Sequence, residues 1–150
     1  MKLGEFRKAP QGPYLFEYWE STFTIPSPIG PFGVELRPIA GQSPDEEMVE
    51  EARELVAFLV THGDEIAQKV FEHYQRLADH PEWLEKCGVP ESLGVYELER
   101  YIRSRALVVT LEEEGPDERY YDEVLFVDPL WDSEHKITLG VRDGRLEFCD

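Results

Sequence analysis

The chain has 150 residues, of which 41% are hydrophobic, and its 32 acidic and 15 basic side chains give a net charge of −17. A chain of this length and composition folds as a single globular domain, 1–150, and buries roughly 70% of its unfolded surface without a disulfide or metal. The charge repels phosphate backbones and argues against nucleic acid as a partner, and no apolar run approaches the 18 residues of a membrane span.

The first third of the chain predicts a β-hairpin. An aromatic run over 14–19, continuing through Phe23 to Ile25, has the composition of a strand that a bulge can interrupt. The proline-rich segment 26–31 then forces a turn. A half-buried return strand follows, because apolar and other residues alternate over Phe32, Gly33, Val34, Glu35, Leu36 and Arg37.

The middle third predicts helices. Ser43 is the expected N-cap, with Pro44 at the first helical position and Glu46 at the third. Gly63 stops or kinks the helix, Pro81 opens a short helix that ends at Gly88, and a turn or short helix follows over 96–102. The apolar residues at helical spacing, expected to face the core, are Val49, Ala52, Val56, Leu59, Val60, Ile66, Val70, Phe71, Tyr74 and Leu77.

The last third predicts two further hairpins. Residues 106–112 and 120–128 are strand-like and flank a glycine- and proline-containing loop. A two-residue turn at Asp143-Gly144 pairs Val141 with Leu146 and Leu139 with Phe148. The order of elements predicts an α+β fold, with a largely antiparallel sheet of N-terminal and C-terminal hairpins and the middle helices packed on one face.

The acidic surface has three interpretations: a solvated surface that maintains solubility, a surface complementary to a basic protein, and halophilic adaptation. The loop between the strand-like segments is the expected binding candidate, because it projects into solvent with little role in the core. Its acidic residues are Glu112, Glu113, Glu114, Asp117 and Glu118. With two cysteines, no CxxC pair and no secretory segment, the expected compartment is the cytoplasm.

Unusual residue types gather in the segment from Trp131 to His135. An extended backbone would place Asp132 and Glu134 on one side, as in general acid/base pairs or hard-cation sites. Alternatively, Asp132 forms an Asx turn and Trp131 is buried where the chain re-enters the sheet. Structural, binding and catalytic interpretations stay open, with Trp131 the binding candidate and Asp132, Glu134 and His135 the weak catalytic ones.

Other site chemistry finds little support in the sequence. His62, His73 and His80 would share one stripe of an unbroken helix, but Gly63 and Pro81 interrupt it. These histidines are therefore expected at the surface or at helix caps. Motifs of zinc proteases, serine hydrolases and phosphate-binding loops are missing, so no metal and no cofactor is predicted.

The segment 131–135, with strand residues 137–141 and the Asp143-Gly144 turn, resembles the C-terminal signature of a group of uncharacterised bacterial domains. In that group a Trp-Asp-x-Glu-His element, usually followed by glycine, opens the last hairpin; here Lys136 stands in the glycine position. The resemblance extends upstream to an aromatic strand pair and a segment like Ser43-Pro44 that leads into helices. It implies the fold and a bacterial origin, and small domains of this kind look like immunity or accessory proteins.

Two functional hypotheses follow. The first is a non-enzymatic, acidic interaction module of immunity or accessory type that binds a basic protein. The second is a small hydrolase or metal-dependent enzyme centred on Asp132, Glu134 and His135. A cleft that gathers those three side chains with a fourth polar ligand would favour the enzyme.

Overall fold

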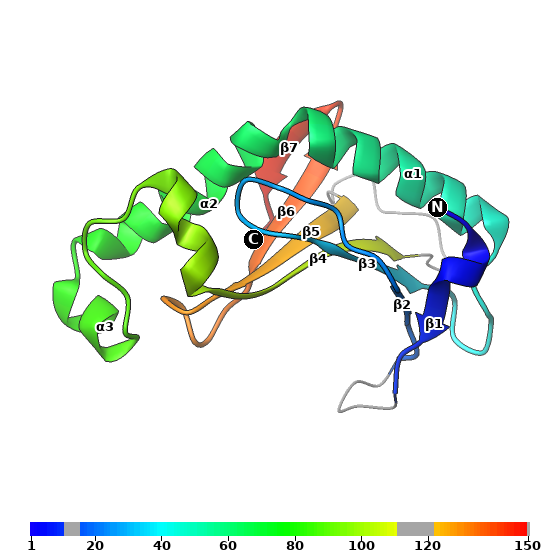
Figure 1. Cartoon of the computed structure of the whole chain (residues 1–150), viewed down its shortest axis with the longest axis horizontal. Coiled ribbons are helices and arrows are strands. Elements are labelled where there is room, and N and C mark those ends of the chain that lie inside the picture. The colour runs from blue at the N-terminus through cyan, green and yellow to red at the C-terminus, as the bar shows by residue number, and fades with distance from the viewer. Residues whose placement is uncertain (11–15, 111–121, 150) are drawn as a thin grey trace.

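The computed structural model describes residues 1–10, 16–110 and 122–149, and it has the predicted α+β architecture (Figure 1). Seven strands lie side by side in chain order, from β1 (Phe6–Lys8) to β7 (Arg145–Phe148). The helices form the middle segment, and the two long ones cross one face of the sheet (Figure 1). The order of hairpin, helices and strands thus gives one layer of helices on one layer of sheet.

The N-terminal strands form an antiparallel set. The strand β2 (Trp19–Ser21) pairs with β1 on one side and with β3 (Gly33–Arg37) on the other. The hairpin between the aromatic run and the return strand is therefore confirmed, but its described first strand is only three residues long. Ile25 and Phe32 add a single bridge beside the turn.

The C-terminal strands form a second antiparallel set: β4 (Ile102–Thr110), β5 (Asp122–Pro129), β6 (Ile137–Arg142) and β7. The two sets meet where β3 pairs with β4 in parallel, from Gly33 opposite Ala106 to Arg37 opposite Thr110. This central pairing requires a long crossover, which the helices between the two strands provide.

The helix α1 (Glu46–Thr61) begins later than the sequence predicts. Asp45, not Ser43, is the N-cap, and its side chain accepts a hydrogen bond from the Met48 amide at 3.0 Å. A carboxylate satisfies an amide of the first turn as well as a hydroxyl does, so Asp45 takes the capping position and Pro44 lies outside the helix.

Three further helical segments follow α1 in the middle of the chain. The helix α2 (Gly63–Ala78) follows α1 after His62 alone, which confirms the interruption at Gly63. Pro81 opens α3 (Pro81–Lys86), and a 3₁₀ helix, η2 (Val95–Tyr101), leads into β4. At the N-terminus, a 3₁₀ turn, η1 (Leu3–Glu5), precedes β1.

The core lies between the sheet and the helices α1 and α2. Most of the predicted helix stripe is buried, but Val60 is 65% exposed, so its assignment to the core is wrong. Val60 follows the fully buried Leu59, and the helical turn of about 100° carries it away from the sheet. The main core residues are Val34, Leu36, Val49, Ala52, Leu59, Ile66, Val70, Tyr74, Leu107, Val109, Leu125, Val127, Ile137, Leu139 and Leu146.

The last hairpin has the predicted turn and register. Asp143 and Gly144 have φ angles of 51° and 72°, as a primed two-residue turn requires. Leu139 lies opposite Phe148 and Val141 opposite Leu146. Leu139 is buried and Phe148 is partly buried, with the cationic groups of Lys69 and Arg76 over its ring at 5.3 and 4.8 Å.

Candidate functional site

The segment from Trp131 to His135 connects β5 to β6 and packs against α2 and α3. Trp131 has no exposed surface, and its ring meets Tyr74 of α2 edge to face at 5.5 Å between centroids. Its carbonyl accepts a hydrogen bond of 2.7 Å from the indole nitrogen of Trp83 on α3. Trp131, the sequence-based binding candidate, is thus the packing centre that ties this loop to both helices.

Asp132 forms the Asx turn that was one of the two sequence-based alternatives. Its Oδ1 accepts hydrogen bonds from the amides of Glu134 at 3.1 Å and His135 at 3.0 Å. The extended alternation, with Asp132 and Glu134 on one side, is therefore wrong. A carboxylate that accepts from two successive amides folds the chain back on itself. The turn forms here with Lys136, not glycine, as the residue that follows His135.

The turn brings two imidazoles to the Asp132 carboxylate. His135 Nδ1 lies 3.5 Å from Oδ1, and the Nε2 atom of His73, on α2, lies 3.9 Å from Oδ2. The side chains of His73 and Asp132 are only 18% and 19% exposed, whereas that of His135 is 74% exposed. Glu134 is exposed. The structure therefore gathers Asp132 and His135 with His73, in an arrangement that we call the His73–Asp132–His135 cluster.

The environment of His73 favours the neutral form of its ring. Burial lowers the pKa of His73 from its ordinary value of 6.5, as do Arg76 and His135, while the negative charge of Asp132 acts in the opposite direction. The Trp131 indole N–H donates to Nδ1 of His73 at 3.0 Å. Because Nδ1 accepts this bond, the proton of the neutral ring resides on Nε2, which faces Asp132.

This tautomer limits the chemistry of the cluster. A general base needs an unprotonated nitrogen open to substrate, but Nδ1 of His73 is occupied by Trp131 and Nε2 carries the proton. His135 is the exposed imidazole, and its Nδ1 lies 3.5 Å from Oδ1 of Asp132. Among residues 1–10, 16–110 and 122–149, no group of three or more His, Cys, Asp or Glu side chains is placed to hold a metal ion.

Sequence reasoning missed His73. It was expected at the surface or at a cap, whereas it contacts the buried Trp131. A usable signal exists: Ile66, Val70, His73 and Leu77 follow the three- and four-residue spacing of the inward stripe. A polar residue at such a position indicates a buried hydrogen-bond partner.

The other histidines lie apart from this cluster. His62, between α1 and α2, stacks on Phe58 with 4.1 Å between ring centroids, and its Nδ1 lies 3.1 Å from Glu65 Oε2. His80 precedes α3 and lines a surface pocket. The expectation of cap or surface positions is therefore confirmed for these two residues.

The acidic loop candidates Glu112, Glu113, Glu114, Asp117 and Glu118 lie outside the described residues. The described part of the chain has another concentration of carboxylates, on the outer side of α1. All of its members are exposed, and we call them the acidic helix face: Glu46, Glu47, Glu50, Glu51 and Glu54. Arg53, which pairs with Glu50, is the basic residue within α1.

Comparisons with protein-family models, curated proteins and solved structures found no match to this chain. In the described residues, no helix is both long and apolar enough to cross a membrane.

Proposed function

We propose that this chain is a non-enzymatic module, of immunity or accessory type, that binds a basic protein through the acidic helix face. The supporting observation is that five exposed glutamates share the outer side of one helix, with one arginine among them. We place this function in the cytoplasm, in line with the cysteine pattern of the sequence.

The spacing of the glutamates along α1 explains why they would favour contact with a basic surface. Glu46, Glu50 and Glu54 are four residues apart, and Glu47 and Glu51 repeat that spacing, so their carboxylates form adjacent rows. Like charges at this spacing disfavour the helix, each pair by about 0.2–0.5 kcal/mol. A basic surface would relieve that repulsion, whereas interspersed lysines would provide solubility without it.

The net charge of −17 adds a longer-range attraction for a basic partner to that of the acidic helix face. A strongly negative protein attracts a basic partner over the Debye length, which is about 30 Å at 0.01 M salt and about 8 Å at 0.15 M. We include the loop residues Glu112, Glu113, Glu114, Asp117 and Glu118 as a second proposed contact, on the sequence argument alone.

The test begins with a partner captured by the tagged chain from its native host and then purified. Association rates are measured from 0.01 to 0.15 M salt for wild type and for the variant Glu47→Gln, Glu50→Gln, Glu54→Gln. We expect the wild-type on-rate to fall by about tenfold or more over this range, and the variant to associate more slowly at low salt.

A matched control separates the helix face from total charge. The variant Glu20→Gln, Glu91→Gln, Glu99→Gln removes the same three charges at exposed positions outside α1. It should retain the larger part of the on-rate. An on-rate that responds neither to salt nor to the α1 substitutions would refute the proposal, and equal effects of both variants would refute its assignment to α1.

One observation favours the alternative, a small hydrolase or metal-dependent enzyme centred on the Trp131 to His135 segment. His135 is an exposed imidazole that lies 3.5 Å from the Asp132 carboxylate, as an oriented base would. Hydrolysis of p-nitrophenyl acetate and of bis-p-nitrophenyl phosphate, with and without added Zn²⁺, tests this. Turnover that is lost in both His135→Ala and Asp132→Asn would support the enzyme, and turnover unchanged in both would reject it.

A further inference from the structure

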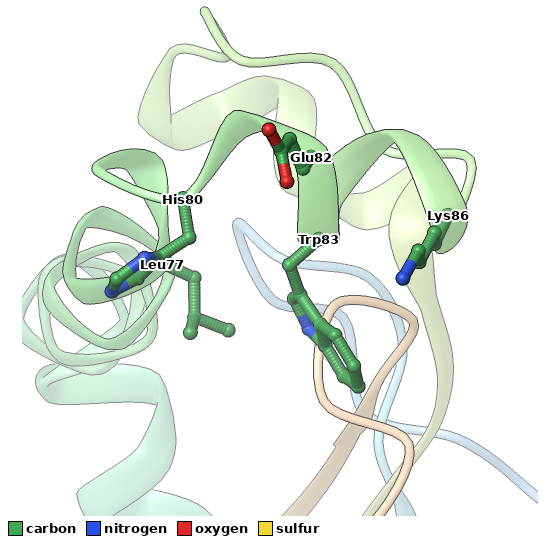
Figure 2. A pocket seen from close by; sticks show the side chains of 5 residues that line it. All are labelled: Leu77, His80, Glu82, Trp83 and Lys86. Carbon is green, nitrogen blue, oxygen red and sulfur yellow. The ribbon is translucent and has the colours of Figure 1, made fainter.

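A pocket of about 390 Å³ lies between the end of α2 and α3 (Figure 2). Its lining residues are Leu77, His80, Glu82, Trp83 and Lys86. In Figure 2 the side chains of Leu77 and Trp83 extend toward the same gap, and Glu82 lies above them at the start of α3, on the side of His80. The pocket thus combines two apolar walls with a carboxylate, an imidazole and the ammonium group of Lys86.

The aromatic wall is fixed in place. The Trp83 indole N–H donates to the Trp131 carbonyl at 2.7 Å, and Trp131 is itself fully buried. Trp83 remains partly exposed, so part of its ring is available to a ligand. A ring held by a buried partner loses little further freedom when a ligand stacks on it, which lowers the entropic cost of binding.

The charge near the pocket is negative on balance, although its lining pairs one carboxylate, Glu82, with one ammonium group, Lys86. The segment 79–86 adds the carboxylates of Asp79 and Glu85 beside the pocket, and the whole chain is strongly negative. Within the part of the chain that the structure describes, Glu82 is exposed and makes no ion pair. An aromatic ring face and an available carboxylate both attract a cation.

We propose that this pocket receives an arginine side chain of the basic partner. The guanidinium stacks on Trp83 and pairs with Glu82, while the aliphatic stem contacts Leu77. A guanidinium suits this geometry better than an ammonium, because it is planar, stacks on aromatic faces and presents several donors to one carboxylate. The inference rests on the proposed function for the identity of the partner, but the pocket is separate from the acidic helix face.

The test uses a small probe and therefore needs no partner. N-acetyl-arginine-N-methylamide is titrated into the full chain to millimolar concentrations, and the indole resonances of Trp83 are followed by NMR. N-acetyl-citrulline-N-methylamide, which has nearly the same shape but no charge, is the matched probe. We expect a saturable shift of Trp83 with the arginine probe and a much weaker one with citrulline.

Three substitutions define the charge contribution. Glu82→Gln should weaken arginine binding about threefold, the effect of an exposed ion pair, and Lys86→Gln should strengthen it by a similar factor. Glu20→Gln, on β2, changes the net charge as Glu82→Gln does and should leave the dissociation constant unchanged within about 1.5-fold, because screening weakens distant charges.

Equal binding of citrulline, equal effects of Glu82→Gln and Glu20→Gln, or weaker binding by Lys86→Gln would each overturn the pocket assignment. The two proposals fail separately. A pocket that ignores the arginine probe, together with a partner on-rate that depends on the α1 glutamates, leaves the binding module in place. A pocket that binds the probe in a chain whose partner on-rate ignores salt and α1 would keep the arginine site and reject the steering model.

Discussion

The indole N–H of Trp131 donates to Nδ1 of His73 at 3.0 Å, so the folded chain accepts the neutral form of this histidine. Protonation would add a hydrogen to Nδ1 and set it against the indole N–H. Burial opposes protonation in the same direction, and it is the largest cause of the lowered pKa of His73. Protonation of His73 on α2 would therefore weaken its contact with Trp131 in the loop between β5 and β6.

Stability should therefore depend on pH through His73. In the unfolded chain this ring takes up a proton below its ordinary pKa of 6.5, whereas the folded chain resists protonation. The contribution is present above pH 6.5 and is lost as pH falls through the lowered folded pKa. Urea unfolding between pH 5 and 8 should show the free energy of unfolding decreasing toward acid.

The control for this pH dependence is His73→Asn, whose Oδ1 replaces the Nδ1 acceptor without titrating. Its stability should fall less between pH 7 and 5 than that of wild type. His80→Asn, at an exposed position, should retain the wild-type slope. If His73→Asn shows the same slope as wild type, another group causes the pH dependence.

Removal of the Trp131 side chain should be strongly destabilising. Trp131 has 0% exposed surface and contacts Tyr74, so Trp131→Ala leaves a cavity and an unpaired His73 nitrogen. We expect a loss of about 3–5 kcal/mol in chemical denaturation. A loss below about 1 kcal/mol would mean that the residue serves recognition instead of packing.

Asp132→Ala and Asp132→Asn should differ. Alanine removes the acceptor of the Glu134 and His135 amides and should cost about 1 kcal/mol, whereas asparagine keeps an oxygen in that position. Both remove the charge that raises the pKa of His73, so an NMR titration of His73 should move to lower pH in both. An unchanged titration would show that Asp132 does not act on His73.

The turn of the last hairpin offers a test of backbone strain. Gly144 has a φ of 72°, and a Cβ there would meet nothing within 4 Å, so Gly144→Ala should cost about 1 kcal/mol through conformation alone. The control is Gly33→Ala in β3, where a Cβ also meets nothing and φ is not positive. If both substitutions cost the same in thermal unfolding, the strain argument fails.

Much of the fold can be predicted because it depends on residues that are close together in the sequence. The Asp143-Gly144 pair defines its own turn, and alternation around Val34 and Leu36 identifies a half-buried strand. The sequence does not fix the start of α1, because Ser43 and Asp45 are both good caps; in the structure Asp45 caps the helix. Val60 was misassigned because Leu59 and Val60 are adjacent apolar residues, and the sequence alone does not show which of them faces the core.

The site was less predictable, since it depends on contacts between distant segments. The sequence identified the 131–135 segment and offered the Asx turn as one alternative. It could not pair Trp131 with His73, because 58 positions separate them and no local period connects the loop to α2. The pocket beside Trp83 likewise exists only because α3 folds back onto the end of α2.

The parallel joint between β3 and β4 has a consequence for the order of folding. Among the strand pairings of the described residues, the other five are antiparallel and join strands that a hairpin or a short loop connects, so each can form early. The parallel pairing of β3 with β4 instead closes a loop over residues 38–101. The entropic cost of closing this loop is offset only when α1 and α2 pack onto the two antiparallel strand sets. Substitutions at this seam, such as Val109→Ala, should therefore slow folding more than equally destabilising changes at the β6–β7 turn.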